Sequence, residues 1–324
     1  MKALLCTRYG TPDDLELAEI ADPVAGPGEA VVRIKAAALN FFDTLIVAGK
    51  YQIKPPMPFS PAAEFAGHVE SLGDGVTGLR VGDRVLGYSG YGAARERIAL
   101  STDRLVKIPD GVDFDRAAGL CVTYGTSLHA LKDRARLAPG ETLAVLGASG
   151  GVGLAAVELG KLMGARVIAC ASSPEKVAFA RRHGAAEGID YGTEDLKEAL
   201  RRATQGKGPD VIYDPVGGSH AEAAVRAISW QGRFLVIGFA AGEIPKLPLN
   251  LVLLKSCDVL GVYWGSWITR DPAGHRANTA QLLQWCAEGK LSSHVHAVYP
   301  LAEAPAALKA IATRQVMGKV ILRP

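Results

Sequence analysis

Four glycines stand close together in Gly147-Ala148-Ser149-Gly150-Gly151-Val152-Gly153. The segment follows an apolar run that predicts a strand, Thr142 to Leu146, and it opens a helical stretch, Leu154 to Leu162. Glycines in such a turn let a phosphate approach backbone N–H groups, and the helix N-terminus favours negative charge. Ala148 replaces the first glycine of the usual fingerprint, so a ligand-free glycine turn is the alternative. The strand and helix context favours a pyrophosphate site whose contacts would be Gly147, Ala148, Ser149, Gly150, Gly151 and Val152.

A second signal follows the next apolar run, Arg166 to Ala171, which ends in Ser172-Ser173-Pro174-Glu175-Lys176. An acidic side chain at this point would bind a free ribose 2′-hydroxyl. Hydroxyls and an ammonium, here Ser172, Ser173 and Lys176, suit a 2′-phosphate instead. Glu175 opposes this interpretation, but after Pro174 it fits an ordinary acid in the first turn of a helix. The cofactor predicted by these residues is NADPH.

The elements that must position these residues change character along the chain. Up to about Pro109, short strands such as Ala30 to Ala37 and Ala66 to Leu72 alternate with turns, which predicts an irregular, mostly β domain. From Arg116 onward, strands alternate with helices, as in a parallel sheet that is covered on both faces. Six strands are expected, the number in a complete Rossmann sheet: Thr142 to Leu146, Arg166 to Ala171, Gly188 to Tyr191, Val211 to Asp214, Phe234 to Ile237 and Val259 to Val262.

Composition limits the remaining possibilities. The chain has 324 residues, 48% of them hydrophobic, and a formal net charge of only +3, which gives weak support to nucleic-acid binding. No stretch approaches the roughly 20 apolar residues of a membrane span. Five scattered cysteines, an odd number, favour reduced thiols in the cytoplasm over a disulfide framework.

The whole chain resembles the zinc-independent quinone oxidoreductases of the medium-chain dehydrogenase/reductase superfamily. The matching stretches occur in family order from end to end: Asn40-Phe41-Phe42-Asp43, Glu64-Phe65-Ala66-Gly67, Val81-Gly82-Asp83-Arg84-Val85, Thr123-Tyr124-Gly125-Thr126, the loop from Ala148 to Gly153, Asp210 to Gly218, Gly232 to Phe239 and Gly318-Lys319-Val320. The resemblance implies an α/β protein with a GroES-like, mostly β catalytic domain and a Rossmann NADP-binding domain. The expected boundaries are 1–118 for the catalytic domain, 119–266 for the Rossmann domain, and 267–324 for a return to the catalytic domain.

The zinc enzymes of this superfamily carry a cysteine near the position of Asn40 and a Gly-His-Glu where this chain has Ala62-Ala63-Glu64. No cysteine lies between Cys6 and Cys121, and His68 stands alone on a strand-like stretch. Zinc needs several converging donors, so no metal is expected. Without a Lewis acid, the acceptor must already be electrophilic, as a quinone or an enone is, and the protein would supply alignment and modest hydrogen bonding.

By resemblance, the catalytic residues are Asn40 beside the nicotinamide, Asp43 supporting the same loop, and Tyr51 in the substrate cleft. Alternatively, Asn40 and Asp43 could cap the start of a helix, and Tyr51 could be an ordinary residue at the edge of the fold. Some family members have a second tyrosine where this chain has Leu45, so a tyrosine proton relay is in doubt. Further cofactor contacts implied by the resemblance are Thr123, Thr126, Tyr191, Val216, Ile237, Gly238, Phe239, Tyr263, Trp264, Gly265 and Lys319. Val216 and Ile237 could instead serve in core packing. The hydroxyl of Thr126 could bond to the backbone of its own helix, and Lys319 could be an ordinary surface lysine.

The resemblance also implies a homodimer, in which the strand Val259 to Val262 pairs antiparallel with the same strand of the second copy. An apolar edge strand left unpaired would invite aggregation.

Three functions remain open. The first is NADPH:quinone oxidoreduction with a small electrophilic substrate. The second is reduction of an activated C=C bond in an enone, alkenal or enoyl thioester. The third is a non-catalytic, crystallin-like NADPH-binding protein.

Overall fold

The computed structural model describes residues 1 to 324, which form two compact units. Met1–Val122 and Ala273–Pro324 make up the first unit, and Thr123–Pro272 make up the second. The boundaries fall at 122 and 272, a few residues beyond the expected 118 and 266. The later boundary follows from helix α9 (Trp264–Arg270), which continues the second unit after its last strand.

The first unit is built on a seven-stranded sheet with the order β14-β15-β3-β4-β5-β7, in which β6 also pairs with β3. All neighbours are antiparallel except β14 and β15. The strands of this unit, including the separate β1-β2 pair, are β1 (Lys2–Leu5), β2 (Glu16–Glu19), β3 (Glu29–Leu39), β4 (Glu64–Leu72), β5 (Arg84–Tyr88), β6 (Arg97–Ser101), β7 (Leu105–Lys107), β14 (Val295–Pro300) and β15 (Lys319–Arg323). Its helices are α1 (Phe41–Val47), α2 (Phe114–Ala118), α10 (Pro272–Ala287) and α11 (Ala304–Ala312). This is the expected irregular, mostly β unit.

Strands β3 and β4 are longer than the sequence pattern predicted, and the extra residues matter for the site. Strand β3 continues past Ala37 to Leu39, and β4 begins at Glu64 instead of Ala66. Ala38 pairs with Glu64, and Leu39 pairs with Val320 of β15. The residues Asn40, Glu64 and Lys319 therefore lie at the adjacent ends of three neighbouring strands.

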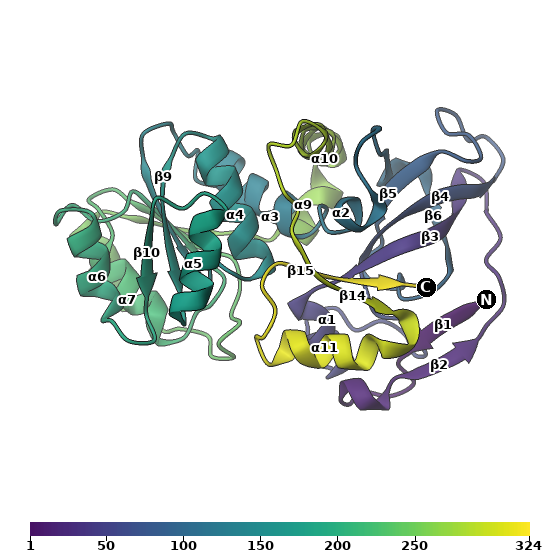
Figure 1. Ribbon diagram of the computed structural model, residues 1–324, viewed down its shortest axis with the longest axis horizontal. Coiled ribbons are helices and arrows are strands. Elements are labelled where there is room, and N and C mark those ends of the chain that lie inside the picture. Colours follow the sequence, from purple (N-terminus) through teal and green to yellow (C-terminus); the bar gives the residue numbers. More distant parts are fainter. The chain divides into compact units, whose positions relative to one another are not determined.

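The second unit is a six-stranded parallel sheet with the order β10-β9-β8-β11-β12-β13, which is the Rossmann order 3-2-1-4-5-6. Its strands are β8 (Thr142–Leu146), β9 (Arg166–Ala171), β10 (Glu187–Asp190), β11 (Val211–Asp214), β12 (Arg233–Val236) and β13 (Asp258–Gly261). Its helices are α3 (Thr123–Leu128), which continues as a wider turn to Arg134, α4 (Gly151–Leu162), α5 (Pro174–Arg182), α6 (Leu196–Ala203), α7 (Ser219–Ala227), α8 (Leu249–Lys255) and α9. All six expected strands are confirmed, three of them displaced by one residue. Figure 1 shows α4 and α5 together beside the sheet, and α6 beside α7.

Each unit has its own apolar core. In the first unit, buried side chains of β3, β4 and β5 meet those of α11, among them Phe65 and Leu308. In the second, residues of β8, β9 and β11 pack against α6 and α7. No helix has the length and apolar character that a membrane crossing requires.

Candidate active site

The glycine-rich loop of the second unit connects β8 to α4 at the carboxyl end of the sheet. Gly147 has a φ of +58°, which favours glycine. A Cβ on Gly153 would lie 2.2 Å from the carbonyl oxygen of Gly147, so the first turn of α4 can approach the strand only if residue 153 is glycine. The first-turn N–H groups of a helix have no carbonyl partner within it. This turn therefore offers the donors and the partial positive charge that suit a pyrophosphate.

Ala148 does not fit the contact predicted for it. Its side chain is wholly buried, and its N–H donates to the carbonyl oxygen of Cys170 at 3.1 Å. The N–H is therefore used to join the loop to β9 and is not available to a phosphate. Its neighbour Ser149 is also buried, so the partly exposed residues of the loop are Gly147, Gly150, Gly151 and Val152.

The end of β9 presents the hydroxyls and the ammonium expected there. Ser173 is the N-cap of α5, and its Oγ accepts from the N–H of Lys176 at 3.4 Å. The Nζ of Lys176 lies 3.4 Å from the Oγ of Ser172 at the exposed surface. Pro174 begins the helix and Glu175 is an exposed acid in its first turn, as the sequence indicated. Ser172 and Lys176 therefore form a cationic, hydroxyl-bearing surface at the end of β9.

The carboxyl ends of β8 and β11 face one another at the point where the strand order reverses, which is where doubly wound sheets bind their ligands. Val216 follows β11, and its Cγ2 lies 3.0 Å from where a Cβ on Gly147 would be. Asp214 holds this turn, because its Oδ1 accepts from the N–H groups of Val216 and Gly217 at 2.8 and 2.9 Å. Burial raises the pKa of Asp214 above its ordinary value. Asp214 was not among the predicted site residues, although an acid directly before a Pro-Val-Gly-Gly turn was the available signal.

Beyond β12, the backbone of Ile237 and Gly238 turns back toward β11, since both N–H groups donate to the carbonyl oxygen of Asp214. Phe239 follows with its ring exposed. On the other side, Tyr191 follows β10, and its ring lies 4.4 Å from that of His220. These residues lie at the same carboxyl edge of the sheet, after β10 and β12.

The residues after β13 are divided between surface and core. Tyr263 is exposed, and Gly265 is partly exposed. Trp264 is buried, with its indole against Gly125, and Trp267 stacks on His129 at 4.1 Å between ring centroids. The side chain of Trp264, a predicted cofactor contact, thus packs inward onto α3, where the missing side chain of Gly125 leaves room for it.

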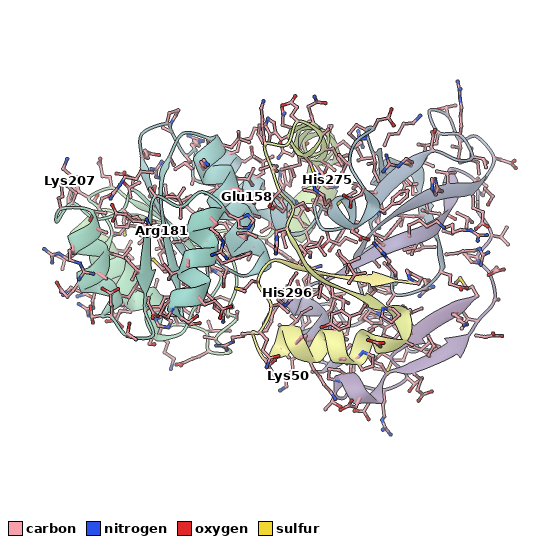
Figure 2. The ribbon with its side chains drawn as sticks, viewed as in Figure 1. Lys50, Glu158, Arg181, Lys207, His275 and His296 are labelled. Carbon is pink, nitrogen blue, oxygen red and sulfur yellow. The ribbon has the colours of Figure 1, made fainter.

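Helix α3 is tied to the phosphate loop by one hydroxyl. The Oγ of Ser127 donates to the carbonyl oxygen of Thr123 at 2.8 Å, and it lies 3.0 Å from the carbonyl oxygen of Val152 and 2.8 Å from the hydroxyl of Tyr213. Thr123 is itself buried, whereas Thr126 is partly exposed. In α4, the carboxylate of Glu158 (Figure 2) accepts a hydrogen bond from the hydroxyl of Tyr124 and forms another with Nδ1 of His183. These bonds fix α3 and α4 against each other.

In the first unit, Asn40 and Asp43 begin helix α1. Asn40 is the N-cap, and the carboxylate of Asp43 accepts from the N–H of Asn40 at 2.7 Å and from the N–H of Ala62 at 3.1 Å. Ala62 has a φ of +63°, so this second bond holds a strained turn before β4. Asp43 is fully buried and cannot touch a substrate in this conformation. The catalytic role predicted for it is therefore corrected to a positioning role.

Burial raises the pKa of Asp43 to about 7, against the opposing effect of the Asn40 N–H and of the Lys319 charge. An acid whose pKa is higher in the folded state holds its proton better when folded, so stability falls as pH rises from about 4 to about 7. From pH 5 to pH 8, the wild type should lose about 2 to 3 kcal/mol of unfolding free energy relative to Asp43→Asn, which has no titrating group at this position. Denaturant titrations of both proteins at several pH values measure this difference. Parallel pH profiles would contradict it.

Tyr51 lies after α1, and its ring stacks on that of Phe42 at 5.5 Å between centroids. The side chain is partly exposed and packs against the core of the first unit. Part of the ring is thus used in packing, while the role of the hydroxyl remains a prediction.

Lys319 is not the cofactor contact that was predicted. Its side chain is 3% exposed, and its Nζ donates to the carbonyl oxygen of Leu39 at 3.1 Å, to Asn40 Oδ1 at 2.7 Å and to Glu64 Oε1 at 2.8 Å. All three N–H donors of the ammonium are thereby used inside the first unit. Glu64 belonged to a matching motif but was not among the predicted site residues. A glutamate in the otherwise apolar stretch Ala-Ala-Glu-Phe-Ala was the signal that it needs a buried partner.

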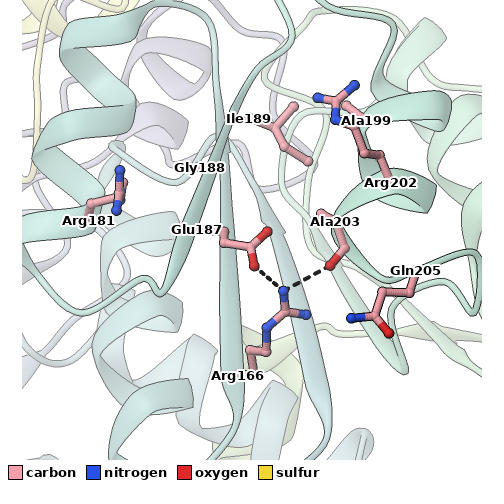
Figure 3. Close-up of a pocket in the computed structure, with 9 residues that line it drawn as sticks. All are labelled: Arg166, Arg181, Glu187, Gly188, Ile189, Ala199, Arg202, Ala203 and Gln205. Atoms are coloured by element: carbon pink, nitrogen blue, oxygen red, sulfur yellow. Dashed lines mark hydrogen bonds and ion pairs between the residues drawn. The ribbon is translucent and has the colours of Figure 1, made fainter.

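A cavity of about 470 Å³ opens at the opposite edge of the second unit's sheet (Figure 3). Arg166 and Glu187, which form an ion pair there, are the first residues of β9 and β10. The cavity therefore lies at the amino ends of the strands, away from the glycine-rich loop. It is separate from the candidate site for the cofactor.

Two family models match the chain. Residues 26–110 match the alcohol dehydrogenase GroES-like domain, and residues 151–288 match the zinc-binding dehydrogenase model. These matches fall in the first unit and chiefly in the second, respectively. They confirm the expected combination of a GroES-like domain with a Rossmann domain.

Among curated proteins, quinone oxidoreductase-like protein 2 of Rattus norvegicus is 37% identical over 322 residues, covering 99% of this chain and 91% of its own length. A quinone oxidoreductase of Pseudomonas aeruginosa is 34% identical, covering 100% of this chain and 99% of its own. Among solved structures, Escherichia coli quinone oxidoreductase complexed with NADPH has a TM-score of 0.92 at 29% identity, with full coverage of both chains. The enoyl reductase CurK has a TM-score of 0.89 at 26% identity, covering 99% of this chain and 98% of its own. The chain therefore belongs to the quinone oxidoreductase-like family of the medium-chain dehydrogenase/reductase superfamily, a family of oxidoreductases.

Proposed function

We propose that the protein is a zinc-independent, NADPH-dependent reductase that transfers hydride to a quinone. The observation that carries the cofactor assignment is the end of β9, where Ser172 and Lys176 stand in place of an acidic residue. A 2′-phosphate suits hydroxyl donors and an ammonium, and an acid would repel it. The NADPH bound to the E. coli relative supports the same assignment. The relatives named for quinone reduction support the acceptor.

The donors at the end of β3 do not fit a catalytic zinc ion, although one matching family model is named for zinc. One oxygen of Glu64 is bound by the ammonium of Lys319 at 2.8 Å, and a dication there would be repelled by that charge. Cys121 is the nearby thiol, and burial raises its pKa well above the ordinary value, which opposes the thiolate that zinc requires. The residues that flank Glu64 are alanine and phenylalanine, which supply no ligand. No step is therefore assigned to a metal.

The reduction needs one hydride and one proton, which NADPH and the solvent supply as a quinone becomes a hydroquinone. NADPH would provide the hydride from its nicotinamide ring. The chain's own residues would bind and align. The first turn of α4 would hold the pyrophosphate, Ser172 and Lys176 the 2′-phosphate, and Asn40 the nicotinamide end. The Tyr51 hydroxyl could then donate a hydrogen bond to the acceptor oxygen as negative charge develops there.

Consumption of NADPH at 340 nm with a panel of quinones, enones and enoyl thioesters tests this function. The expected result is turnover with quinones, greater with NADPH than with NADH, and unchanged by a chelator. Turnover confined to enones or enoyl thioesters would favour activated C=C reduction, to which the likeness to an enoyl reductase points. Tight NADPH binding without any turnover would favour the non-catalytic protein, and loss of turnover on chelation would overturn zinc independence.

We also propose a homodimer formed by β13. This strand is the edge of its sheet, pairing only with β12. Val259 is 42% exposed, and Leu249, Leu253 and Leu254 of the preceding helix α8 are even more exposed. An apolar edge strand beside exposed leucines is the surface that a second copy would cover by antiparallel pairing.

Replacing Val259 with glutamate should convert the dimer to a monomer, since the twofold axis would bring two buried carboxylates close together. Light scattering after gel filtration should show twice the chain mass of 34.0 kDa for the wild type and a single mass for Val259→Glu. The control is Val24→Glu, at a more exposed valine of the first unit, which should stay dimeric. A monomeric wild type would refute the dimer.

We propose a cytoplasmic location as well. The five cysteines form no disulfide, and all are buried. Scattered thiols of this kind are typical of proteins in reducing compartments. Fractionation of cells that express the tagged protein would test the location.

A further inference from the structure

Three buried polar side chains meet where β3, β4 and β15 lie side by side. Asn40 is 7% exposed, Glu64 is 0% exposed and Lys319 is 3% exposed. Each comes from the end of a different strand, and all belong to the first unit. Charged groups are rarely buried so completely unless their partners are fixed, so the bonding pattern of this trio can be followed atom by atom.

Both oxygens of the Glu64 carboxylate accept hydrogen bonds. Its Oε1 accepts from Lys319 Nζ at 2.8 Å and from Asn40 Nδ2 at 3.0 Å, while its Oε2 accepts from the N–H of Val122 at 2.8 Å. Lys319 completes the triangle by donating to Asn40 Oδ1 at 2.7 Å. Asn40 therefore contacts the ammonium of Lys319, which can only donate hydrogen bonds, and the carboxylate of Glu64, which can only accept them.

This arrangement permits one orientation of the Asn40 carboxamide. Its Oδ1 must face the ammonium, and its Nδ2 must face the carboxylate. A flipped amide would set NH₂ against the ammonium and its oxygen against the carboxylate, losing two charge-assisted hydrogen bonds in a buried site. Because Oδ1 also faces the N–H of Asp43 in the capping box at the start of α1, the locked amide keeps one Nδ2 hydrogen for a ligand.

We propose that Lys319, together with Glu64, is a positioning residue that locks the Asn40 carboxamide, and so decides which of its atoms faces the nicotinamide. The proposal rests on the proposed role of Asn40 in the reductase. A buried ion pair kept only for stability is the competing explanation, and such pairs are weak sources of stability. The two explanations differ in one respect. Positioning acts through Asn40, whereas stabilisation does not.

The variant that separates them is Lys319→Met combined with Glu64→Gln. Lys319→Met alone would leave the carboxylate of Glu64 buried without a counter-charge and could unfold the protein. In the double variant, the N–H of Val122 still requires an oxygen from residue 64, so the new amide must turn its NH₂ toward Asn40. Asn40 should then flip to accept from it. The double variant should therefore fold, with the Asn40 amide reversed.

Nuclear magnetic resonance can observe that amide directly, because the chain has only three asparagines, Asn40, Asn250 and Asn278. In protein labelled with ¹⁵N-asparagine, the Asn40 signals are assigned by their loss in Asn40→Ala. We expect an Asn40 Nδ2 proton that exchanges at least ~10-fold more slowly than those of exposed Asn250, and that shifts strongly in the double variant. Buried Asn278 in α10 is the internal control and should not move. Rapid exchange of Asn40 in the wild type, or an unchanged Asn40 signal in the double variant, would overturn the proposal.

A kinetic cycle then tests the link to catalysis. The double variant and Asn40→Ala should each lower kcat about 100-fold, the order of loss expected for a lost or misdirected hydrogen bond at the reacting group. Adding Asn40→Ala to the double variant should lower kcat by no more than ~2-fold further, because both changes remove the same alignment. If the kcat of the combined variant fell by the product of the two separate factors, the ion pair would act independently of Asn40. If the wild type reduces no acceptor, the proposed function fails, while the resonance experiment still decides the orientation of Asn40.

Discussion

Replacing Gly153 with alanine should weaken the binding of NADPH and NADH alike by about 100-fold. The new Cβ would lie 2.2 Å from the carbonyl oxygen of Gly147, so the loop or the start of α4 must move. Moving that turn costs at least two charge-assisted hydrogen bonds to the pyrophosphate, about 3 kcal/mol, which corresponds to about 100-fold in affinity. Calorimetric titration with each dinucleotide measures the loss.

Gly150→Ala is the matched control in the same loop. Its Cβ would be 3.5 Å from the Gly147 oxygen, an ordinary contact, and its φ of −75° suits alanine. The free protein should therefore melt at the wild-type temperature. Any loss of affinity in Gly150→Ala then measures how closely the phosphate approaches the backbone. If Gly153→Ala bound both dinucleotides normally, the loop would not be the pyrophosphate site.

Replacing Lys176 with glutamate should weaken NADPH about 10- to 100-fold and change NADH by less than ~3-fold. A hydrogen bond to a charged group contributes about 1.5 to 3 kcal/mol, and the new carboxylate would also repel the 2′-phosphate. NADH has no such phosphate, so its affinity should not depend on this side chain. Titrations with both cofactors at two ionic strengths measure the difference, which should shrink as salt increases.

Lys207→Glu makes the same charge change elsewhere on the second unit. Lys207 is exposed (Figure 2) and precedes β11, at the amino edge of the sheet, away from the end of β9. It should affect neither cofactor. Equal losses of NADPH and NADH in Lys176→Glu would remove Lys176 from the 2′-phosphate site, and a loss in Lys207→Glu would indicate only a long-range charge effect.

The amide of Asn40 and the carboxylate of Asp43, which follow β3, illustrate why a motif match assigns roles incompletely. Asn40 and Asp43 were both expected to be catalytic. Asp43 instead has both carboxylate oxygens bound to backbone N–H groups. Which member of a motif can contact a ligand depends on the direction of its side chain, and the buried carboxylate of Asp43 is bound to the turn at Ala62.

The sequence by itself determined the architecture of the second unit. Apolar strands between helical stretches predicted six parallel strands, and a glycine-rich turn after the first of them, with Ser172 and Lys176 after the second, predicted a phosphate site. These signals are local, because each depends on periodicity or on residues a few positions apart. Pro174 and Ser173 even marked the start of α5 correctly.

Only the tertiary structure decided what Ala148, Trp264 and Lys319 do. Ala148 donates to Cys170 of a neighbouring strand, Trp264 fills the space left by Gly125, and Lys319 reaches Asn40 across 279 residues of sequence. A lysine after a glycine near the end of a chain is ordinarily solvated, and no local pattern distinguishes it from a buried one. Its partners become neighbours only when β15 pairs with β3, since strand pairing joins residues without regard to their separation in sequence.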